Sequence, residues 1–469
     1  MSVKLRNVLT KRKATFRPLE EGRVRMYTDG PTVHALADLG LARRIVVNDL
    51  IKRVLIANGY TVTHVMNVTD LDDKTINASA DAGEDIKDLT QRFEREFFAD
   101  MAALGCLSAD HTPRTSDHIE QMLALTRKLI DAGYCYEMLR SVYFNVGKAK
   151  DYGRLSGVDT RKIRFGATVD LDDYEKNDPR DFVMFKRCDL AEIRRGIGVK
   201  SEWGHVRPGW HVQCAAMSTH YLGLKFDLHI SGKDLAFPHH ENEIAQIGAL
   251  TGEPPAHTWV HSELVYAGGK KMNRVAGNAK TVRELLDAGY EGRALRYWII
   301  TTNYRHPLHY SEENLETAKK SLHRLDLFMR RLKHVRGDQR HPELLPLARR
   351  AEADFFAALA DDINISAAMA VLFDLMRKVN QLTIDFPLSP ADARDILATF
   401  YRADAVLNVL SFAEDTIDRE IERLLKKREK ARAAGDYAAA DAIRDQLAQR
   451  GLQIIDTAHG PRIATVERD

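Results

Sequence analysis

The fold is decided by residues 24–68, which read VRMYTDGPTVHALADLGLARRIVVNDLIKRVLIANGYTVTHVMNV. Val24–Tyr27 is a short apolar run that predicts a strand, and Gly30-Pro31 is typical of the loop that follows one. Gly40–Asn58 has apolar residues at helical spacing, and Thr61–Val68 alternates as a second strand does. This βαβ unit predicts an α/β protein built on a Rossmann-type doubly wound parallel sheet.

The alternation of predicted strands and helices is interrupted by one segment before it resumes. Residues 116–205 begin with a helical pattern and then become rich in loops, so we interpret them as a connective insertion. The first half of the sheet domain would then occupy residues 1–115, and the second half residues 206–310.

Helical patterns dominate the rest of the chain. Residues 311–410 carry long amphipathic stretches, such as Leu315–Leu332 and Ser366–Leu382, that predict an α-helical bundle. Residues 411–469 are expected to form a small C-terminal domain, in which Ile417–Gln449 is a helical hairpin followed by a short β tail.

Composition narrows the class of protein. A hydrophobic content of 44% and a charged content of 29% are typical of soluble globular proteins. The net charge of +2 neither demands nor excludes nucleic acid as a partner, because local patches matter more than the sum. The four cysteines show no framework spacing, which favours a reducing cytoplasm. We expect no membrane association, since neither a signal peptide nor an apolar run of spanning length is visible.

Two neighbouring stretches offer side chains that can coordinate zinc. Gly209-Trp210-His211-Val212-Gln213-Cys214 is followed 23 residues later by Phe237-Pro238-His239-His240-Glu241-Asn242-Glu243. A helix starting near Pro238 would put His239 and Glu243 on one face, because they are four residues apart. On spacing alone, a buried structural thiol beside two helix-capping side chains is an equally good interpretation of Cys214, His239 and Glu243.

The same stretches closely resemble two signature blocks of the cysteinyl-tRNA synthetases, which are class I aminoacyl-tRNA synthetases. The blocks are Arg207–Met217 and Phe237–Gln246, and the resemblance extends from Lys4 to about Val466. Asn67–Lys74 and Asp181–Lys186 also match family blocks. The resemblance implies ATP-dependent activation of cysteine as an adenylate and transfer of cysteine to tRNA.

The resemblance also implies one Zn²⁺ per chain that binds the substrate thiolate. Three family ligands fall on Cys214, His239 and Glu243, and the fourth, a cysteine in the family, falls on Asp29. Aspartate is a legitimate zinc ligand, but it makes the ligand set harder and weakens the preference for sulfur. The substrate-binding positions of the family fall on Thr69, Trp210 and His211, although a Trp-His pair taken alone indicates core packing.

The first nucleotide motif departs from the family. Where the family has H-I-G-H at a helix N-terminus, this chain has Asp38-Leu39-Gly40-Leu41. Gly40 is retained and allows ATP to approach the backbone, but Asp38 puts a negative charge beside the expected phosphates. Losing two donors predicts slow adenylate formation unless other groups compensate. Arg43 and Arg44 are candidates, and a surface basic pair is the simpler interpretation.

The second motif, K-M-S-K-S in the family, reads Lys271-Met272-Asn273-Arg274-Val275. Lys271 is retained, and Arg274 keeps the charge of the second catalytic lysine without its compact ammonium. The adenosine-binding stretch of the family aligns with residues 229–234, in which His229, Gly232 and Asp234 match. The resemblance therefore assigns catalytic roles to Asp38, Gly40, Lys271 and Arg274, and binding of ATP with Mg²⁺ to Gly40, His229, Gly232, Asp234, Lys271 and Arg274.

The C-terminal segment carries a basic helix. Its cations are Arg423, Lys426, Lys427, Arg428, Lys430 and Arg432. Charge alone favours a solvated helix face that pairs with nearby glutamates. Residues 433–445, however, resemble the anticodon-contacting domain of the family, which makes tRNA an expected partner.

Three functions remain open from the sequence. The chain is interpreted first as a cytoplasmic, monomeric cysteine–tRNA ligase that uses ATP, cysteine or a related amino acid, and tRNA. The second interpretation is a paralogue that activates another amino acid or loads another acceptor. The third is a non-catalytic protein that binds tRNA or an amino acid, which Asp38 and Leu41 favour. The candidate metal ligands favour the first two.

Overall fold

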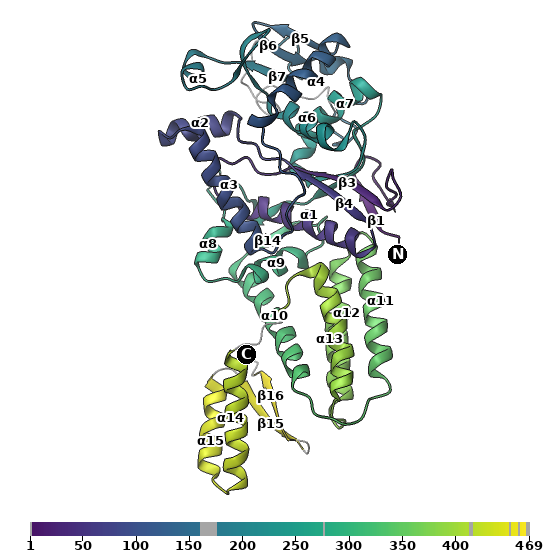
Figure 1. The fold of residues 1–469 in the computed structure, drawn as a ribbon, viewed down its shortest axis with the longest axis vertical. Coiled ribbons are helices and arrows are strands. Elements are labelled where there is room, and N and C mark those ends of the chain that lie inside the picture. Colours follow the sequence, from purple (N-terminus) through teal and green to yellow (C-terminus); the bar gives the residue numbers. More distant parts are fainter. Residues whose placement is uncertain are drawn as a thin grey trace.

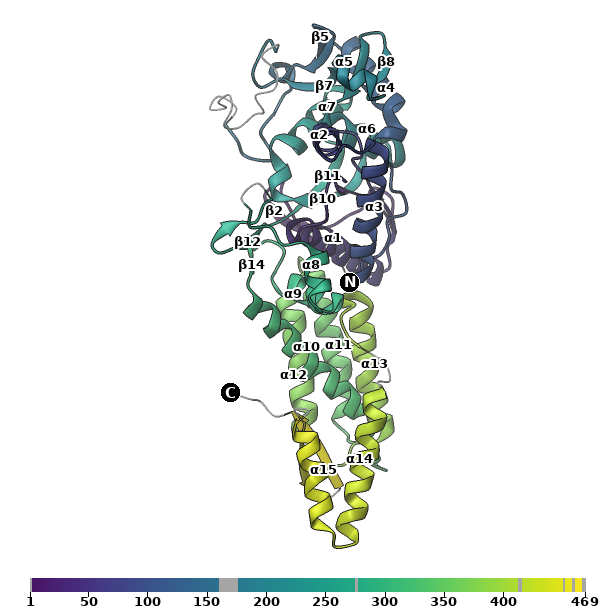
Figure 2. The same ribbon diagram turned by 90° about the vertical axis from the view of Figure 1, so that its left-hand side faces the viewer.

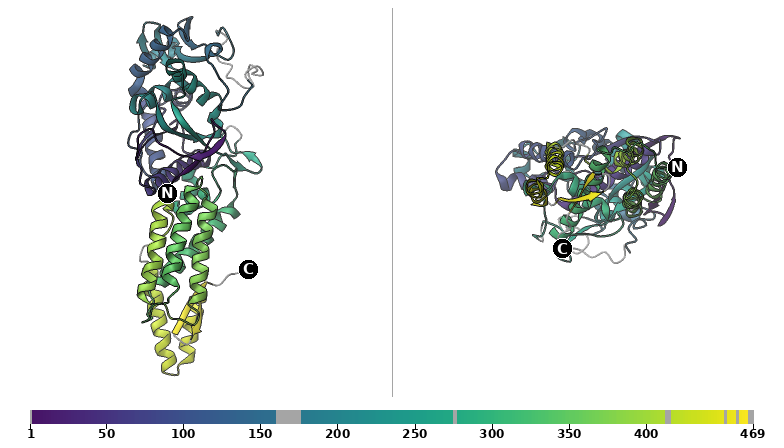
Figure 3. Two further views of the ribbon diagram at one scale, coloured as in Figure 1. Left: turned by 90° about the vertical axis from the view of Figure 1, so that its right-hand side faces the viewer. Right: turned by 90° about the horizontal axis from the view of Figure 1, so that it is seen from below.

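The computed structural model describes residues 2–159, 176–274, 277–411, 416–449, 452–457 and 460–465. The molecule is elongated, with the α/β part at one end, a helical bundle in the middle and a small C-terminal unit at the other end (Figure 1). The side views in Figures 2 and 3 show the bundle helices running away from the sheet domain along the long axis. The predicted fold class is confirmed.

A four-stranded parallel sheet forms the centre of the α/β part. Its strands are β3 (Arg23–Thr28), β4 (Thr61–Met66), β10 (Phe226–Gly232) and β11 (Ala256–Ser262), in the order β11-β10-β3-β4. Helix α1 (Leu39–Ala57) connects β3 to β4. The predicted βαβ unit is therefore confirmed, with element ends that differ by at most two residues.

Both faces of this sheet are buried, as expected for parallel strands. Met26 packs with Leu228 and the α1 residues of the main core, whereas the next residue, Tyr27, packs with Cys214 and Trp259 on the opposite face. Because successive strand residues point to opposite faces, this alternation places α1 and α6 (Trp210–Leu222) on the two sides of the sheet.

The strand order reverses direction between β3 and β10. After β3 the chain proceeds to β4 on one side, and the second half of the domain adds β10 and β11 on the other side. Ligands of open α/β sheets bind outside the carboxyl ends of the strands at such a switch point. Asp29 directly follows β3 and Lys233 directly follows β10, so both lie at this position.

The segment between the two sheet halves forms an antiparallel sheet of its own. Its order is β5-β6-β7-β9-β8, with α4 (Ile119–Asp131) packed beside it. The strands are β5 (Cys135–Met138), β6 (Ser141–Phe144), β7 (Phe182–Arg187), β8 (Val199–Ser201) and β9 (Gly204–Pro208).

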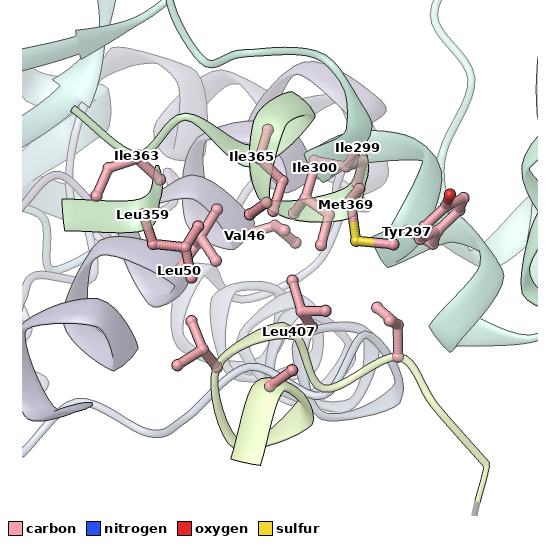
Figure 4. Packing of buried hydrophobic residues seen from close by; sticks show 14 of the residues in the cluster. Val46, Leu50, Tyr297, Ile299, Ile300, Leu359, Ile363, Ile365, Met369 and Leu407 are labelled. Carbon is pink, nitrogen blue, oxygen red and sulfur yellow. The ribbon is translucent and has the colours of Figure 1, made fainter. Parts of the chain in front are cut away.

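The helical bundle shares a continuous core with the sheet domain. It contains α10 (Glu312–Lys333), α11 (Leu344–Ala360), α12 (Ile365–Leu382) and α13 (Pro390–Leu407). Val46 and Leu50 of α1 meet Ile299 and Ile300 of α9 (Gly292–Thr301), together with Leu407, at the junction shown in Figure 4. The predicted helices Leu315–Leu332 and Ser366–Leu382 are confirmed as α10 and α12.

The C-terminal unit consists of two helices and a hairpin of strands. These are α14 (Thr416–Ala433), α15 (Tyr437–Gln449), β15 (Leu452–Thr457) and β16 (Gly460–Thr465). The helical hairpin and the β tail are thus confirmed.

The remaining elements are short or peripheral. They are β1 (Lys4–Asn7), β2 (Arg12–Thr15), α2 (Asp73–Ala82), α3 (Ile86–Ala103), η1 (Ser116–His118), η2 (Val146–Lys148), α5 (Leu190–Arg194), η4 (Lys233–Leu235), η5 (Ala236–His240), α7 (Glu241–Thr251), β12 (Val265–Ala267), β13 (Lys270–Lys271), α8 (Val282–Asp287) and β14 (Leu308–Tyr310). No helix of the described part of the chain is long and apolar enough to cross a membrane.

A buried ion pair joins α1 to α9 where the sheet domain meets the bundle. Asp49 of α1, 3% exposed, accepts a hydrogen bond from Arg296 of α9, which is fully buried and also donates to the carbonyl oxygen of Leu407 at 2.6 Å. Replacing Asp49 with alanine leaves the Arg296 charge unpaired, so we expect the free energy of unfolding to fall by about 3–5 kcal/mol. Urea denaturation measures this loss.

The exposed pair Arg350–Asp354 provides the matched control. Its side chains are 83% and 57% exposed, so Asp354→Ala should cost about 1 kcal/mol or less. Equal losses for Asp49→Ala and Asp354→Ala would show that burial of the first pair is not what stabilises the junction.

Candidate active site

Four side chains of metal-ligand type converge beyond the carboxyl end of β3. Asp29 comes from the loop after β3, Cys214 from α6, His239 from the short helical segment Ala236–His240, and Glu243 from α7. One ligand atom of each lies within 4.8 Å of all the others. All four residues are at most 4% exposed. The helix that we expected to start near Pro238 begins at Glu241, so His239 reaches the cluster from the turn before α7.

The spacing of the donor atoms suits a tetrahedral zinc ion. His239 Nε2 lies 3.4 Å from Cys214 Sγ, 3.0 Å from Glu243 Oε1 and 3.7 Å from Asp29 Oδ1. Zinc bonds of ordinary length at tetrahedral angles separate such ligand atoms by roughly 3.3–3.6 Å. The four residues therefore have the chemistry and the spacing of a metal-binding set.

Each carboxylate of the cluster has one oxygen hydrogen-bonded to a histidine outside the ligand set and one that faces His239 Nε2, at 3.0 Å for Glu243 and 3.7 Å for Asp29. Asp29 Oδ2 lies 2.8 Å from His240 Nε2, and Glu243 Oε2 lies 3.2 Å from His229 Nε2. The other oxygens, Asp29 Oδ1 and Glu243 Oε1, are buried without a hydrogen-bond partner among the described residues. Buried carboxylate oxygens are costly unless a cation lies beside them, which a metal ion or a protonated His239 would provide here.

A second set, formed by Asp29, Glu243, His229 and His240, also satisfies the spacing criterion. In this set the two histidines are hydrogen-bonded to the outer oxygens of Asp29 and Glu243, and the set contains no sulfur ligand. We therefore assign these two histidines to the layer that orients the carboxylates, a role that commonly supports metal ligands.

Electrostatics favour charged carboxylates in this buried cluster. Burial opposes ionisation of Asp29, but nearby His229, together with His239 and His240, outweighs it and holds the pKa of Asp29 well below its usual value. Burial also raises the pKa of the Cys214 thiol to about 12, so a metal ion that binds here must displace this proton.

Aromatic and imidazole rings fix the orientation of His239. The Trp210 ring stacks on the His239 ring, with centroids 4.1 Å apart. Nδ1 of His239 lies 2.9 Å from Nδ1 of His211. Trp210 and His211 also line a cavity of about 370 Å³, which Phe237 and Lys186 border as well. Thr69, the third predicted substrate residue, is buried, and its backbone N–H donates to the carbonyl oxygen of Pro31. The substrate roles of these residues remain predictions.

The predicted nucleotide residues lie around the carboxyl end of β10. Gly232 ends this strand, and a β-carbon there would meet Asp234 Oδ1 at 2.6 Å, so a larger residue would require the Asp234 side chain to move. Lys271 Nζ lies 3.4 Å from Asp234 Oδ2. His229 is placed differently, because its ring is fully buried against Trp259 and Glu243 beneath the metal-ligand cluster. Its predicted contact with the nucleotide stays a prediction.

Asp38 has two structural partners. Its Oδ1 accepts a hydrogen bond from the backbone N–H of Leu41 at 2.9 Å and so caps α1, whose first turn contains Gly40. Its Oδ2 lies 4.0 Å from Arg274 Nε. The two altered motif positions therefore face each other, and Arg274 offsets part of the negative charge that Asp38 introduces.

Sequence reasoning missed or misplaced three residues near the site. His261, on β11, lies 3.0 Å from His240 Nδ1 and extends the histidine layer, but an isolated histidine in a strand gives no signal. Arg43 is wrongly interpreted as a surface residue, because it is 1% exposed and donates to the carbonyl oxygens of Leu264 and His306. Arg44, the other member of the predicted surface pair, is half-buried and donates a hydrogen bond to the carbonyl oxygen of Gly30 at the switch point.

Comparisons with solved structures define the class of the fold. The Mycobacterium tuberculosis methionyl-tRNA synthetase in complex with methionyl-adenylate covers 82% of this chain and 90% of its own, with a TM-score of 0.59 and 16% identity. The Agrobacterium radiobacter K84 LeuRS–tRNA–LeuAMS complex covers 97% of this chain and 92% of its own, with a TM-score of 0.61 and 11% identity. The sheet, the insertion and the bundle are thus those of a class I aminoacyl-tRNA synthetase.

Sequence comparisons define the family. Residues 15–320 match the family described as tRNA synthetases class I (C) catalytic domain, residues 354–412 match the DALR domain, and residues 414–459 match the cysteinyl-tRNA ligase anticodon binding domain. The cysteine–tRNA ligase of Thioalkalivibrio sulfidiphilus is 41% identical over 98% of both chains, and that of Geobacillus sp. strain WCH70 is 39% identical over 98% of this chain and 99% of its own. The chain belongs to the cysteinyl-tRNA synthetase family.

Proposed function

We propose that this protein is a cysteine–tRNA ligase that forms cysteinyl-adenylate from cysteine and ATP with Mg²⁺ and transfers the cysteinyl group to tRNA. The observation that carries the proposal is the meeting of Asp29, Cys214, His239 and Glu243 beside the switch-point crevice. A thiol-binding metal next to a nucleotide crevice is what selective activation of cysteine requires. The comparisons support the same reaction, because the relatives are cysteine–tRNA ligases over their whole length.

The metal is proposed to be zinc, held by those four side chains. Bound zinc would supply a Lewis acid that keeps the substrate sulfur as a thiolate. The protein fixes the donors beforehand, since His240 and His229 hold the outer oxygens of Asp29 and Glu243. This arrangement leaves the inner oxygens directed to the metal position.

The first chemical step joins cysteine to the nucleotide. An oxygen of the cysteine carboxylate attacks the α-phosphorus of ATP, a new P–O bond forms, and the bond to the β-phosphate oxygen breaks as pyrophosphate leaves with its electron pair. In the second step a ribose hydroxyl of the tRNA end attacks the carbonyl carbon, loses its proton, and AMP leaves. We propose that Lys271 and Arg274 approach the phosphates, once ATP draws them from Asp234 and Asp38.

The parts of the chain are proposed to divide the work. Residues 1–115 and 206–310 form the adenylate, residues 116–205 border the amino-acid cavity, and residues 411–469 contact tRNA. Residues 311–410 connect the two ends. We place the enzyme in the cytoplasm, where its four unpaired cysteines would stay reduced.

Pyrophosphate exchange with each of the twenty amino acids, combined with elemental analysis of the same sample, tests the proposal. We expect exchange with cysteine and about one zinc per chain. Exchange with another amino acid only would identify a paralogue of different specificity. Tight tRNA binding without exchange would identify a non-catalytic binding protein and would refute the proposal.

The C-terminal unit offers a separate test of tRNA binding. Lys427 and Lys430 are exposed on α14, whereas Arg428 is 5% exposed and packs inward. Lys427→Glu with Lys430→Glu should raise the KM for tRNA about tenfold and flatten its salt dependence, because phosphate contacts are lost. Pyrophosphate exchange should not change. Glu429→Lys on the same helix is the matched control and should lower the KM; unchanged KM values in both variants would remove α14 from the tRNA surface.

A further inference from the structure

Arg44 lies between the carboxyl ends of β3 and β10, at the switch point of the sheet. It lies one turn beyond Leu41 on α1, and its Nη2 donates to the carbonyl oxygen of Gly30 at 3.0 Å, just past the end of β3. Its Cδ lies 3.5 Å from the position that a β-carbon would take on Gly232, at the end of β10. The arginine side chain therefore lies beside Gly30 and Gly232, between the carboxyl ends of the two central strands.

The guanidinium of Arg44 has few partners of its own. It is half-buried, its Nε is buried without a hydrogen-bond partner among the described residues, and no described carboxylate lies within 4.0 Å of it. A partly desolvated cation without a counter-charge is unfavourable. An anionic ligand in the crevice would supply both the charge and the acceptors, since arginine offers five donors and matches phosphate geometry.

The neighbouring cations are already committed. Arg43 donates to the carbonyl oxygens of Leu264 and His306 and serves the fold. Lys271 and Arg274 face Asp234 and Asp38 respectively, so each has a carboxylate nearby. Unlike Lys271 and Arg274, Arg44 would not have to leave a carboxylate to meet a phosphate.

We propose that Arg44 contacts the α-phosphate of ATP and supplies there the positive charge that Asp38 and Leu41 do not. As a carboxylate oxygen attacks and the charge on the α-phosphate spreads over its equatorial oxygens, a fixed guanidinium at the switch point stabilises that charge without reorganisation. The Gly30 contact holds the guanidinium in place from the side opposite the nucleotide. This inference rests on the proposed adenylate formation.

The test compares Arg44→Met, which keeps the stem and removes the charge, with Arg44→Lys, which keeps the charge. Arg92→Met is the control, because Arg92 forms an exposed pair with Glu84 on a distant surface. We expect Arg44→Met to reduce kcat/KM for ATP in cysteine-dependent exchange about 10²-fold, Arg44→Lys to recover part of the loss, and Arg92→Met to match the parent protein. Unchanged kinetics in Arg44→Met would overturn the proposal.

Two further measurements separate the possible outcomes. If Arg44 only stabilises the loop at Gly30, Arg44→Met lowers the midpoint temperature of thermal unfolding and leaves the KM for ATP unchanged. That result would also overturn the proposal. If the parent protein shows no exchange with any amino acid, the proposed function fails, and calorimetry with a non-hydrolysable ATP analogue decides about Arg44. Weaker binding of that analogue by Arg44→Met supports the contact; equal binding, or no binding by the parent protein, refutes it.

Discussion

Replacing Cys214 with alanine should abolish both metal binding and cysteine activation. Cys214 is the one sulfur in the cluster, and without it Asp29, His239 and Glu243 retain only three donor side chains around the metal position. Because structural and substrate-binding zinc sites depend on a complete ligand set, we expect the zinc content to fall from about one per chain to a small fraction. Exchange with cysteine should fall by about 10³-fold or more, since no thiolate is held beside the nucleotide.

Elemental analysis and pyrophosphate exchange on the same preparation measure the two effects. Cys135→Ala is the matched control, because Cys135 is also a buried thiol, 8% exposed, but lies on β5 of the insertion away from the cluster. It should keep the metal and the activity. A Cys214→Ala protein that is folded, free of zinc and still activates cysteine normally would refute the metal assignment.

Local sequence patterns are sufficient to predict the individual helices and strands, because each helix or strand depends on residues close in sequence. The alternation in Thr61–Val68 and the helical spacing in Gly40–Asn58 report which side chains must face a core. The pairing of β3 with β10 could not be predicted, since pairing of distant parallel strands leaves no local signal in the sequence.

Prediction of the candidate site from the sequence fails in the same way for contacts between distant residues. The residue types of Cys214, His239 and Glu243 are compatible with a metal site and the family resemblance predicts one, but the partners that orient these side chains cannot be found from the sequence. The contact of His240 with Asp29, for example, joins positions 211 residues apart. Such contacts depend on how two loops dock at the end of the sheet, and no residue spacing encodes that.

Asp38 illustrates how a substitution can be misjudged without coordinates. The sequence suggests an unopposed negative charge among phosphates. The structure shows a helix cap whose second oxygen faces Arg274, a residue of the other altered motif. Arg274, which keeps the positive charge of the family's lysine, thus partly offsets the carboxylate that Asp38 adds.

Restoring histidine at both positions of the first motif, with Asp38→His and Leu41→His, should accelerate adenylate formation. Two imidazole donors would return to the N-terminus of α1, where phosphates are expected, and the carboxylate would be removed. One transition-state donor is worth about 10²–10³ in rate, and because Arg44 is proposed to supply part of this charge already, we expect a gain in kcat of about 10²-fold. The lost cap should lower the free energy of unfolding by about 1 kcal/mol.

Asp38→Asn separates the two consequences of the change. Asparagine caps a helix as well as aspartate does, so stability should be retained while the charge that faces Arg274 disappears. This variant should show little gain in exchange, because it adds no donor directed at the phosphates. If the double histidine variant is no faster than Asp38→Asn with any of the twenty amino acids, the N-terminus of α1 does not face the α-phosphate, and the crevice must bind its nucleotide through other groups.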